Sequence, residues 1–287
     1  MIGTIRIFLV VAAMVALSLS LIPFQYLFLK LKNGWKRRLP NFFHRIVARL
    51  FGFRIRTVGK LHEGCPLLLV SNHTSWSDIV VLSAVGQVSF IAKSEVRDWP
   101  VFGMFAVLQR TVFVERARRG KTVHQTSEIA NRLIAGDAMV LFAEGTTSDG
   151  NRVLPFKTAL FGAAHAAIRE AGVAEVAVQP VAIAYTRVHG MAMGRYFRPL
   201  VSWPGDVELM PHLNGILREG AIDVEVRFGE PVFVTAETDR KALARTMENR
   251  VRALLQSALL GREIPELEKP SRLSPSKTAT KAVDSPA

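Results

Sequence analysis

The first 60 residues of this 287-residue chain contain no aspartate or glutamate, although they hold eleven lysines and arginines. The first acid is Glu63, so the remaining 227 residues carry only about +2 of the formal charge of +13. A basic N-terminal fifth on a balanced body indicates an anionic partner at that end, either nucleic acid or lipid. The basic stretch borders a membrane-length segment and matches no nucleic-acid-binding module. We therefore expect lipid and no nucleic acid.

Several kinds of site are also missing. A single cysteine, Cys65, excludes an internal disulfide. The seven histidines and Cys65 show no metal-ligand spacing, so no metal site is expected. The chain lacks the Gly-x-Ser-x-Gly turn of α/β-hydrolases. Gly120-Lys121-Thr122 resembles the end of a phosphate-binding loop, but Glu115 stands where that loop requires glycine.

One long apolar run begins the chain. Residues Ile7 to Leu29 carry no charge, and 23 residues suffice to cross a bilayer. A cleaved signal peptide is the alternative, but the run is long for one and basic residues from Lys30 to Arg38 follow directly. Those charges favour the cytoplasmic side of the inner membrane for the rest of the chain. We expect residues 1–31 to be a membrane segment; whether it spans or dips into the bilayer stays open.

The next segment, residues 32–60, combines apolar and basic residues at helical spacing. From Phe42 to Phe51, apolar side chains alternate with Arg45 and Arg49. This pattern is typical of a helix lying among anionic lipid headgroups. A core helix of the folded domain is the alternative, and we favour the interfacial interpretation. At the other end, residues 261–287 lack periodicity and are expected to be a disordered tail.

Residues 61–260 alternate short apolar strands with helical patterns, which predicts an α/β domain with a single mixed sheet flanked by helices. The expected strands are Leu67–Ser71, Val88–Ala92, Thr111–Val114, Ala138–Phe142, Val176–Ala184 and Asp223–Phe228. The expected helices are Ser77–Val85, Val101–Leu108, Lys121–Ala135, Phe156–Ala171, Val207–Leu217 and Thr238–Leu260.

A histidine and an aspartate, His73 and Asp78, stand between the first of these strands and the first helix. Histidine accepts protons near neutral pH. An aspartate in the first helical turn suits the helix dipole and can fix the tautomer of the imidazole. Such a pair often arises by chance, and a lone histidine at a strand end is more often structural than catalytic.

Three further strand ends strengthen the catalytic interpretation. The segment Thr111–Arg116 ends in an acid and an arginine. The segment Leu141–Ser148 brings Glu144 and Gly145 into a hydroxyl-rich loop. The segment Val178–Ile183 contains Pro180, which we expect at a sheet edge or a bend. Ligands of α/β sheets bind where strand ends lead into loops.

Together these segments resemble the four ordered motifs of the glycerolipid acyltransferase family, which acylates lysophosphatidic acid. Asn72-His73 through Asp78 resembles the N-H-x-x-x-x-D block, and Phe113 to Arg116 resembles the strand ending in an acid and an arginine. Residues Phe142 to Ser148 resemble F-P-E-G-T-R-S, and Gln179-Pro180-Val181 resembles the valine–proline strand. The resemblance covers roughly residues 60–235.

The resemblance implies an O-acyltransferase in which His73 is the general base and Asp78 orients it. No cofactor is implied, because the donor is an activated acyl thioester on acyl carrier protein or coenzyme A. The acceptor is a lysolipid hydroxyl, and the membrane surface is the further partner. The residues implied in substrate binding are Asn72, Ser75, Arg116, Glu144, Gly145, Thr146 and Lys157.

Two positions depart from the family pattern. Ala143 replaces the usual proline, and Thr147 replaces an arginine in the motif implicated in acceptor binding. Loss of that guanidinium removes a bidentate phosphate contact. The stretch from Glu144 to Arg152 resembles the lyso-ornithine lipid branch of the family, and the Trp203-Pro204-Gly205-Asp206 segment is assigned with it.

We therefore favour lyso-ornithine lipid as acceptor. Synthesis of phosphatidic acid from lysophosphatidic acid stays open, because Arg152 and Lys157 can replace the missing charge. A non-catalytic lipid-binding or scaffold protein of the same fold is the rival of another class. The presence of His73, Asp78 and Glu144 argues against it.

Overall fold

The structure is a computed structural model that describes residues 2–63, 66–114, 122–205, 207–235, 237–263 and 271–272. Its strands are β1 (Phe53–Val58), β2 (Leu67–Ser71), β3 (Val88–Lys93), β4 (Val112–Val114), β5 (Ala138–Phe142), β6 (Val176–Val188), β7 (Met191–Ala192), β8 (Ile222–Phe228), β9 (Val232–Val234) and β10 (Ser271–Arg272). The helices are α1 (Ile2–Leu31), α2 (Trp35–Phe51), α3 (Ser77–Val85), α4 (Phe102–Leu108), α5 (Thr122–Ile134), α6 (Thr158–Ala171), α7 (Gly194–Phe197), α8 (Leu209–Glu219) and α9 (Arg240–Leu259), with 3-10 turns η1 (Ser94–Asp98) and η3 (Arg198–Leu200).

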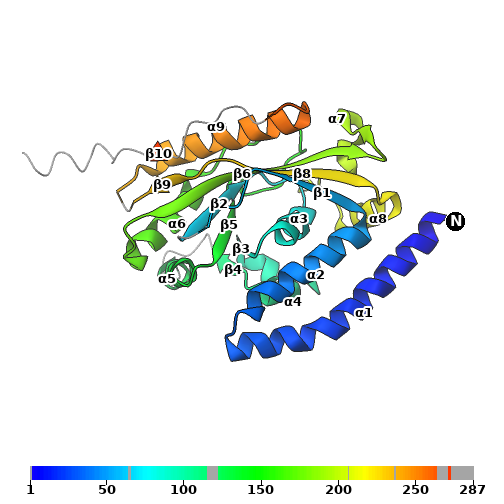
Figure 1. Ribbon diagram of the computed structural model, residues 1–287, viewed down its shortest axis with the longest axis horizontal. Coiled ribbons are helices and arrows are strands. Elements are labelled where there is room, and N and C mark those ends of the chain that lie inside the picture. Colours follow the sequence, from blue (N-terminus) through cyan, green and yellow to red (C-terminus); the bar gives the residue numbers. More distant parts are fainter. Residues whose placement is uncertain are drawn as a thin grey trace, which may run out of the picture.

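The strands form a single mixed sheet in the order β1-β8-β6-β2-β5-β3-β4. Strand β2 lies in the middle and pairs in parallel with both β5 and β6, whereas β8 runs antiparallel to β6. Figure 1 shows α9 over one side of the sheet and α1, α2 and α3 on the other. The expected fold class, a mixed α/β sheet flanked by helices with an apolar N-terminal helix, is confirmed.

The central strands are buried on both faces. Every residue of β2 is buried, and alternate residues enter two different cores. Leu68 and Val70 pack in the core under α5, α6 and α9, while Leu67 and Leu69 pack in the core under α2 and α3. A strand buried on both faces needs a continuous apolar sequence, which explains why this strand could be predicted with its observed bounds.

The first 60 residues are joined to the sheet more closely than expected. Strand β1 pairs in parallel with β8, so the folded domain begins before Leu61. Helix α2 buries Val47, Ala48 and Phe51 against the core, so protein covers this face, while Trp35 and Phe42 are exposed; contact of the exposed side with lipid headgroups stays a prediction. Helical periodicity marks an apolar face without showing whether lipid or protein covers it. The basic residue Arg45 remains on the exposed side.

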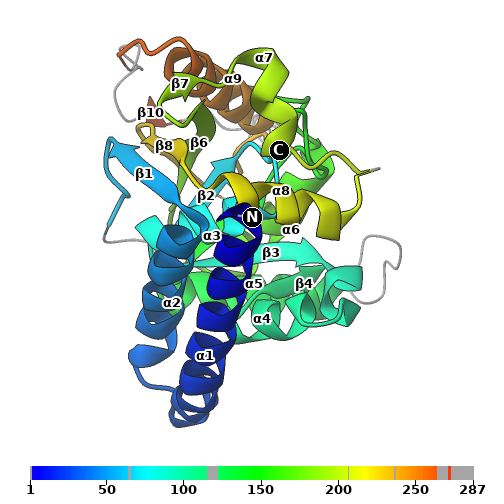
Figure 2. The ribbon, with the colours of Figure 1, turned by 90° about the vertical axis from the view of Figure 1, so that its right-hand side faces the viewer.

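Helix α1 lies alongside α2 (Figure 2). Among the described residues, Gly3–Leu31 is the one helix long and apolar enough to cross a membrane by length and composition. Val10 is buried, and Ile7, Met14 and Leu17 pack on the same core from one side of the helix. The rest of α1 exposes large apolar side chains: Ile5, Phe8, Leu9, Val11, Val15, Leu19, Phe24, Tyr26, Leu27 and Leu31.

Pro180 lies inside the sheet, which corrects the expected edge position. On the side of β6 away from β2, the strand pairs with β9 up to Val178 and with β8 from Val181 onward. Pro180 falls in the gap between these two partners, where its missing N–H breaks no ladder bond. Its carbonyl still accepts a hydrogen bond from the Gly229 N–H at 2.9 Å.

Helix α9 and the other helices otherwise lie within a few residues of their expected bounds. Cys65 and residues 264–270 and 273–287 of the predicted tail lie outside the described residues.

Candidate active site

The loop between β2 and α3 brings His73 and Asp78 into contact. The Nδ1 atom of His73 lies 2.8 Å from Oδ2 of Asp78, whose side chain is fully buried. The same Oδ2 accepts the backbone N–H groups of Thr74 at 2.7 Å and Ser75 at 2.9 Å. A carboxylate is an acceptor only, so Nδ1 of the ring carries the proton and donates it. The lone pair of the neutral imidazole is therefore on Nε2, the atom that can take a proton from a substrate.

Tyr185 on β6 completes the surroundings of Asp78 and was not predicted. Its hydroxyl donates to Oδ1 of Asp78 at 2.9 Å and lies 2.7 Å from the Ser77 hydroxyl. Burial raises the pKa of Tyr185 well above its usual value, and the nearby Asp78 charge adds to this. The phenol is thus a neutral donor that holds the second carboxylate oxygen. A tyrosine one residue beyond an expected strand offers no sequence signal for this role.

Phe142 fixes the ring of His73 from a second direction. The two rings stack with centroids 3.9 Å apart and an interplanar angle of 14°. Phe90 stacks on Phe142 in turn, at 6.0 Å. Edge contact with Asp78 and face contact with Phe142 leave the imidazole, 19% exposed, little freedom to rotate. Phe142 belongs to the motif from Phe142 to Ser148, but the sequence gives no sign of its stacking on His73.

The buried side chain of Glu144 joins two backbone segments of the site. Its side chain accepts the His73 N–H at 2.8 Å on one oxygen and the Leu154 N–H at 3.0 Å on the other. Burial raises the pKa of Glu144 to about 8, although both N–H groups act in the opposite direction. At 1% exposure the residue offers little surface to an acceptor. The geometry therefore indicates that Glu144 positions the His73 backbone, a role different from the expected lining of a pocket.

The side chains of Asn72 and Ser75 likewise form hydrogen bonds within the protein. The Asn72 amide donates to the Ile183 carbonyl at 3.0 Å and accepts the Ile183 N–H at 2.9 Å. The Ser75 hydroxyl accepts the Ser77 N–H at 3.3 Å. Both side chains are at most 1% exposed. Their contacts hold the loop that carries His73, and the expectation that they contact substrate has no support in this geometry.

The other predicted substrate residues lie on the loop after β5 or outside the described residues. Gly145 adopts a left-handed φ of 69°, which suits a glycine, and its N–H donates to the Phe142 carbonyl. Thr146 is exposed. Lys157 is exposed just before α6, where its backbone N–H donates to the Ala143 carbonyl at 2.9 Å. Arg116 lies outside the described residues.

Trp203 joins the loop after β5 to the loop between β2 and α3, which carries His73 and is called the catalytic loop below. The Thr147 hydroxyl donates to the Trp203 carbonyl. The Trp203 N–H donates to the Thr74 carbonyl at 2.9 Å, and the Ser148 N–H donates to the His73 carbonyl at 2.8 Å. Thr147 thus makes a structural contact in place of the guanidinium that the family pattern would put there. The assignment of the Trp203–Asp206 segment to the same site is supported at Trp203; Asp206 lies outside the described residues.

The arrangement can supply a general base, and among the described residues no serine or cysteine is hydrogen-bonded to the His73 ring. Asp78 orients His73 through a hydrogen bond, as the aspartate of a catalytic triad orients its histidine. Such a base can deprotonate a bound hydroxyl and leave it to attack a carbonyl carbon directly. This chemistry suits transfer of an acyl group that is already activated.

Comparisons with known proteins agree with this chemistry. Residues 53–184 match the family model described as Acyltransferase. The chain is 50% identical over 262 residues to a lyso-ornithine lipid O-acyltransferase from Rhizobium meliloti (strain 1021), covering 91% of this chain and 90% of that protein. It is 34% identical over 189 residues to a 1-acyl-sn-glycerol-3-phosphate acyltransferase from Neisseria gonorrhoeae, covering 66% and 69%.

One solved structure supports the fold alone. The crystal structure of the 1-acyl-sn-glycerophosphate (LPA) acyltransferase PlsC from Thermotoga maritima matches with a TM-score of 0.59 and 21% identity. The match covers 89% of this chain and 97% of that one. The arrangement of sheet and helices is therefore shared with that protein over nearly the whole of it.

Proposed function

The chain belongs to the family of acyltransferases that act on lysolipids, and we propose that it transfers a fatty acyl chain from a thioester to the free hydroxyl of lyso-ornithine lipid. The observation that carries the proposal is the hydrogen bond between His73 and Asp78, which leaves Nε2 of the histidine able to accept a proton.

The proposed reaction has one addition and one elimination. Nε2 of His73 removes the proton of the acceptor hydroxyl while the oxygen attacks the thioester carbonyl carbon. The tetrahedral intermediate collapses, the carbon–sulfur bond breaks, and the thiolate takes the proton back from the imidazolium. Asp78 stabilises the imidazolium in between. A positioned base of this kind contributes about 10²- to 10⁴-fold in rate. The donor is the thioester of acyl carrier protein or coenzyme A.

The acceptor choice is supported by Thr147 and by the named relatives. Thr147 has no guanidinium, and its hydroxyl is used by the Trp203 carbonyl. An acceptor with a phosphate headgroup would lack a bidentate partner at this position. The relative with 50% identity is named for lyso-ornithine lipid. Acylation of lysophosphatidic acid is the second candidate, because the Neisseria relative is named for it and Arg152 and Lys157 are exposed nearby in the chain.

The proposed setting is the surface of the inner membrane, facing the cytoplasm. Helix α1 uses one side to pack on the body, so the opposite apolar side is available to lipid. Phe8 and Leu19 on that side are 72% and 71% exposed. Exposure of such large apolar side chains to water is unfavourable. A helix held along the body favours insertion into one leaflet over a full crossing. The basic residues Lys30 to Arg38 would then meet anionic headgroups.

The test is a comparison of acceptors with purified protein. Labelled acyl thioester is supplied with either lyso-ornithine lipid or lysophosphatidic acid, and His73→Ala serves as the blank. Product from lyso-ornithine lipid, absent from the blank, is the expected result. Product from lysophosphatidic acid alone would replace the proposed acceptor, and undiminished activity of His73→Ala would overturn the mechanism.

A further inference from the structure

Two charged side chains lie beside the loop that carries His73, and neither forms a direct ion pair within the described part of the chain. Within the described part of the chain, no acid lies within ion-pair distance of Arg198, and no base lies within that distance of Asp149. We propose that Arg198 and Asp149 form the headgroup subsite of the acceptor, with Arg198 binding a carboxylate and Asp149 binding an ammonium group. This inference rests on the proposed function.

Arg198 enters the site from η3, where it was not anticipated. It is only 7% exposed, and its guanidinium donates to the carbonyls of Gly150 at 3.1 Å and Gly194 at 3.2 Å. Carbonyl contacts satisfy N–H groups but bring no counter-ion into contact with the guanidinium, and the Asp149 charge acts on it only from beyond ion-pair distance. A buried charge without a counter-ion is costly unless something else pairs with it. The remaining terminal nitrogen, Nη2, has no hydrogen-bond partner among the described residues and can meet a ligand.

Arg198 is adjacent to the loop that carries the base. A Cβ atom on Gly150 would lie 2.8 Å from Cγ2 of Thr74 and 3.3 Å from Cδ of Arg198. Gly150 therefore sits between the residue after His73 and the stem of the arginine. The left-handed φ of 69° at Gly150 allows this close approach. A headgroup held by Arg198 would thus lie beside the catalytic loop.

Asp149 immediately precedes that glycine and is exposed. One carboxylate oxygen accepts the Asn151 N–H at 3.0 Å, which leaves the other oxygen available. Partial burial alone would raise the pKa of Asp149, but the Asn151 contact and the charges of Arg152 and Arg198 lower it. The residue is therefore an anion at neutral pH, close enough to Arg198 for each charge to act on the other.

Opposite charges on two neighbouring segments, Asp149 on the loop after β5 and Arg198 on η3, fit a zwitterion better than a phosphate. The ornithine headgroup keeps a free carboxylate and a free δ-ammonium group when its α-amine is acylated. Arg198 offers the N–H donors of Nη2 to the carboxylate, and Asp149 offers its second carboxylate oxygen to the ammonium. A phosphate monoester would meet repulsion from Asp149. With this pair of charges, a site without the family's arginine could still select its acceptor.

The test compares three acceptors that share the 3-hydroxyacyl chain. They are N-(3-hydroxyacyl)-ornithine, the norvaline analogue that lacks the ammonium group, and the putrescine analogue that lacks the carboxylate. Asp149→Asn should lower kcat/KM about tenfold or more for the ornithine and putrescine acceptors, with little effect on the norvaline analogue. Arg198→Gln should have the complementary pattern: kcat/KM should fall for the ornithine and norvaline acceptors and change little for the putrescine analogue.

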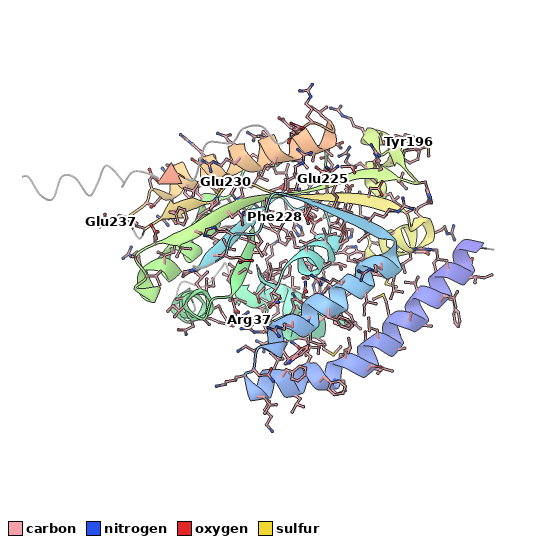
Figure 3. All side chains as sticks on the ribbon, in the orientation of Figure 1. Arg37, Tyr196, Glu225, Phe228, Glu230 and Glu237 are labelled. Carbon is pink, nitrogen blue, oxygen red and sulfur yellow. The ribbon has the colours of Figure 1, made fainter. Side chains whose placement is uncertain are left out.

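Controls separate recognition from loss of structure. Arg245→Gln and Glu237→Gln make the same charge changes at exposed positions and should leave the kcat/KM values of all three acceptors unaffected. Figure 3 shows Glu237 at the opposite end of the molecule from Tyr196, which lies two residues before Arg198. Asp149→Asn keeps an oxygen for the Asn151 N–H and should fold, so the test does not depend on the buried arginine.

The outcomes distinguish this inference from the proposed function. Equal losses on all three acceptors in Asp149→Asn and Arg198→Gln would show a structural role and overturn the subsite, while acylation of the ornithine acceptor by the unaltered enzyme would keep the function. If the unaltered enzyme acylates lysophosphatidic acid and none of the three, both the function and the subsite are overturned.

Discussion

The hydroxyl of Tyr185 donates a hydrogen bond to Oδ1 of Asp78 at 2.9 Å, across 107 residues of sequence. Through this contact β6 holds the carboxylate that orients the catalytic base. Tyr185→Phe should lower kcat about tenfold with little change in KM, because one hydrogen bond to a charged acceptor is lost while the acceptor pocket is intact. Steady-state kinetics test this. Tyr196→Phe, at a position 86% exposed, is the matched control and should be silent (Figure 3); a comparable loss there would contradict the assignment.

The stacking of Phe142 on His73 makes a second prediction. Phe142→Leu keeps much of the apolar volume but removes the flat surface against the imidazole. We expect kcat to fall several-fold, because the ring gains freedom to leave its productive orientation. Phe161→Leu makes the same change in the other core, to which Phe142 does not belong, and should cost about 1 kcal/mol of stability without a matching loss of kcat. Equal kinetic effects in the two variants would refute the positioning role.

Glu144 makes stability depend on pH. Its pKa is about 8 in the folded protein, against 4.5 as the reference value, so the folded state retains a proton that the unfolded state loses. The contribution of this group to stability is therefore full below about pH 4.5 and decreases as pH rises toward 8. Thermal unfolding of the unaltered protein should show this decline, and Glu144→Gln should flatten it.

The flattening must be specific to that position. Glu144→Gln is also expected to lower Tm overall, because an amide cannot accept both backbone N–H groups. The exposed Glu230→Gln, labelled in Figure 3, should leave the pH profile of Tm unchanged. A Tm that declines with pH equally in Glu144→Gln would assign the dependence to other groups.

Asp137 fastens the N-terminal helices to the sheet. Its carboxylate is paired with Arg37 on α2 at 2.6 Å, with Arg110 at 2.6 Å and with Arg132 on α5. Asp137→Asn leaves these guanidinium groups without their common counter-ion and should destabilise the protein by about 3 kcal/mol or more. Urea unfolding in detergent measures this. Arg37→Gln removes only one of the cations and should cost less; the reverse order would contradict the account.

The exposed side of α1 predicts how the protein binds vesicles. Phe8→Asp combined with Leu19→Asp should weaken binding to anionic vesicles at least about a hundredfold, since each apolar side chain contributes roughly 1.5–3 kcal/mol on burial. Flotation with vesicles measures it. Met14→Ala, on the packed side of α1, should retain binding. Unchanged binding of the double variant would place the lipid contact elsewhere.

The sequence could predict what is local. His73 and Asp78 are five residues apart on a strand–helix turn, and their hydrogen bond could be anticipated from that spacing. The strands buried on both faces were predicted with nearly their observed bounds, because continuous apolar runs mark them. The role of α2 could not be settled in this way, since the same amphipathic pattern suits a core and a headgroup layer.

What escaped prediction depends on partners far apart in the chain. Tyr185, Arg198 and Trp203 reach the site from β6 and the segment after it, and no periodicity records such contacts. Strand β1 lies in a stretch whose charged residues Arg54 and Arg56 break the apolar pattern, because its outer face is exposed. Pro180 could be noticed from sequence, but its position between two successive partner strands depends on the topology of the sheet.

The amide of Asn72 reaches Ile183, which is made 111 residues later. Both neighbours of β2 in the sheet, β5 and β6, also follow it in the chain. At synthesis rates of about 5–20 residues per second, some 5 to 20 seconds separate the emergence of the base from that of its supports. During this interval the nascent chain carries its N-terminal apolar helix but no ordered base. Attachment of α1 to a bilayer can therefore precede catalytic competence on every newly made molecule.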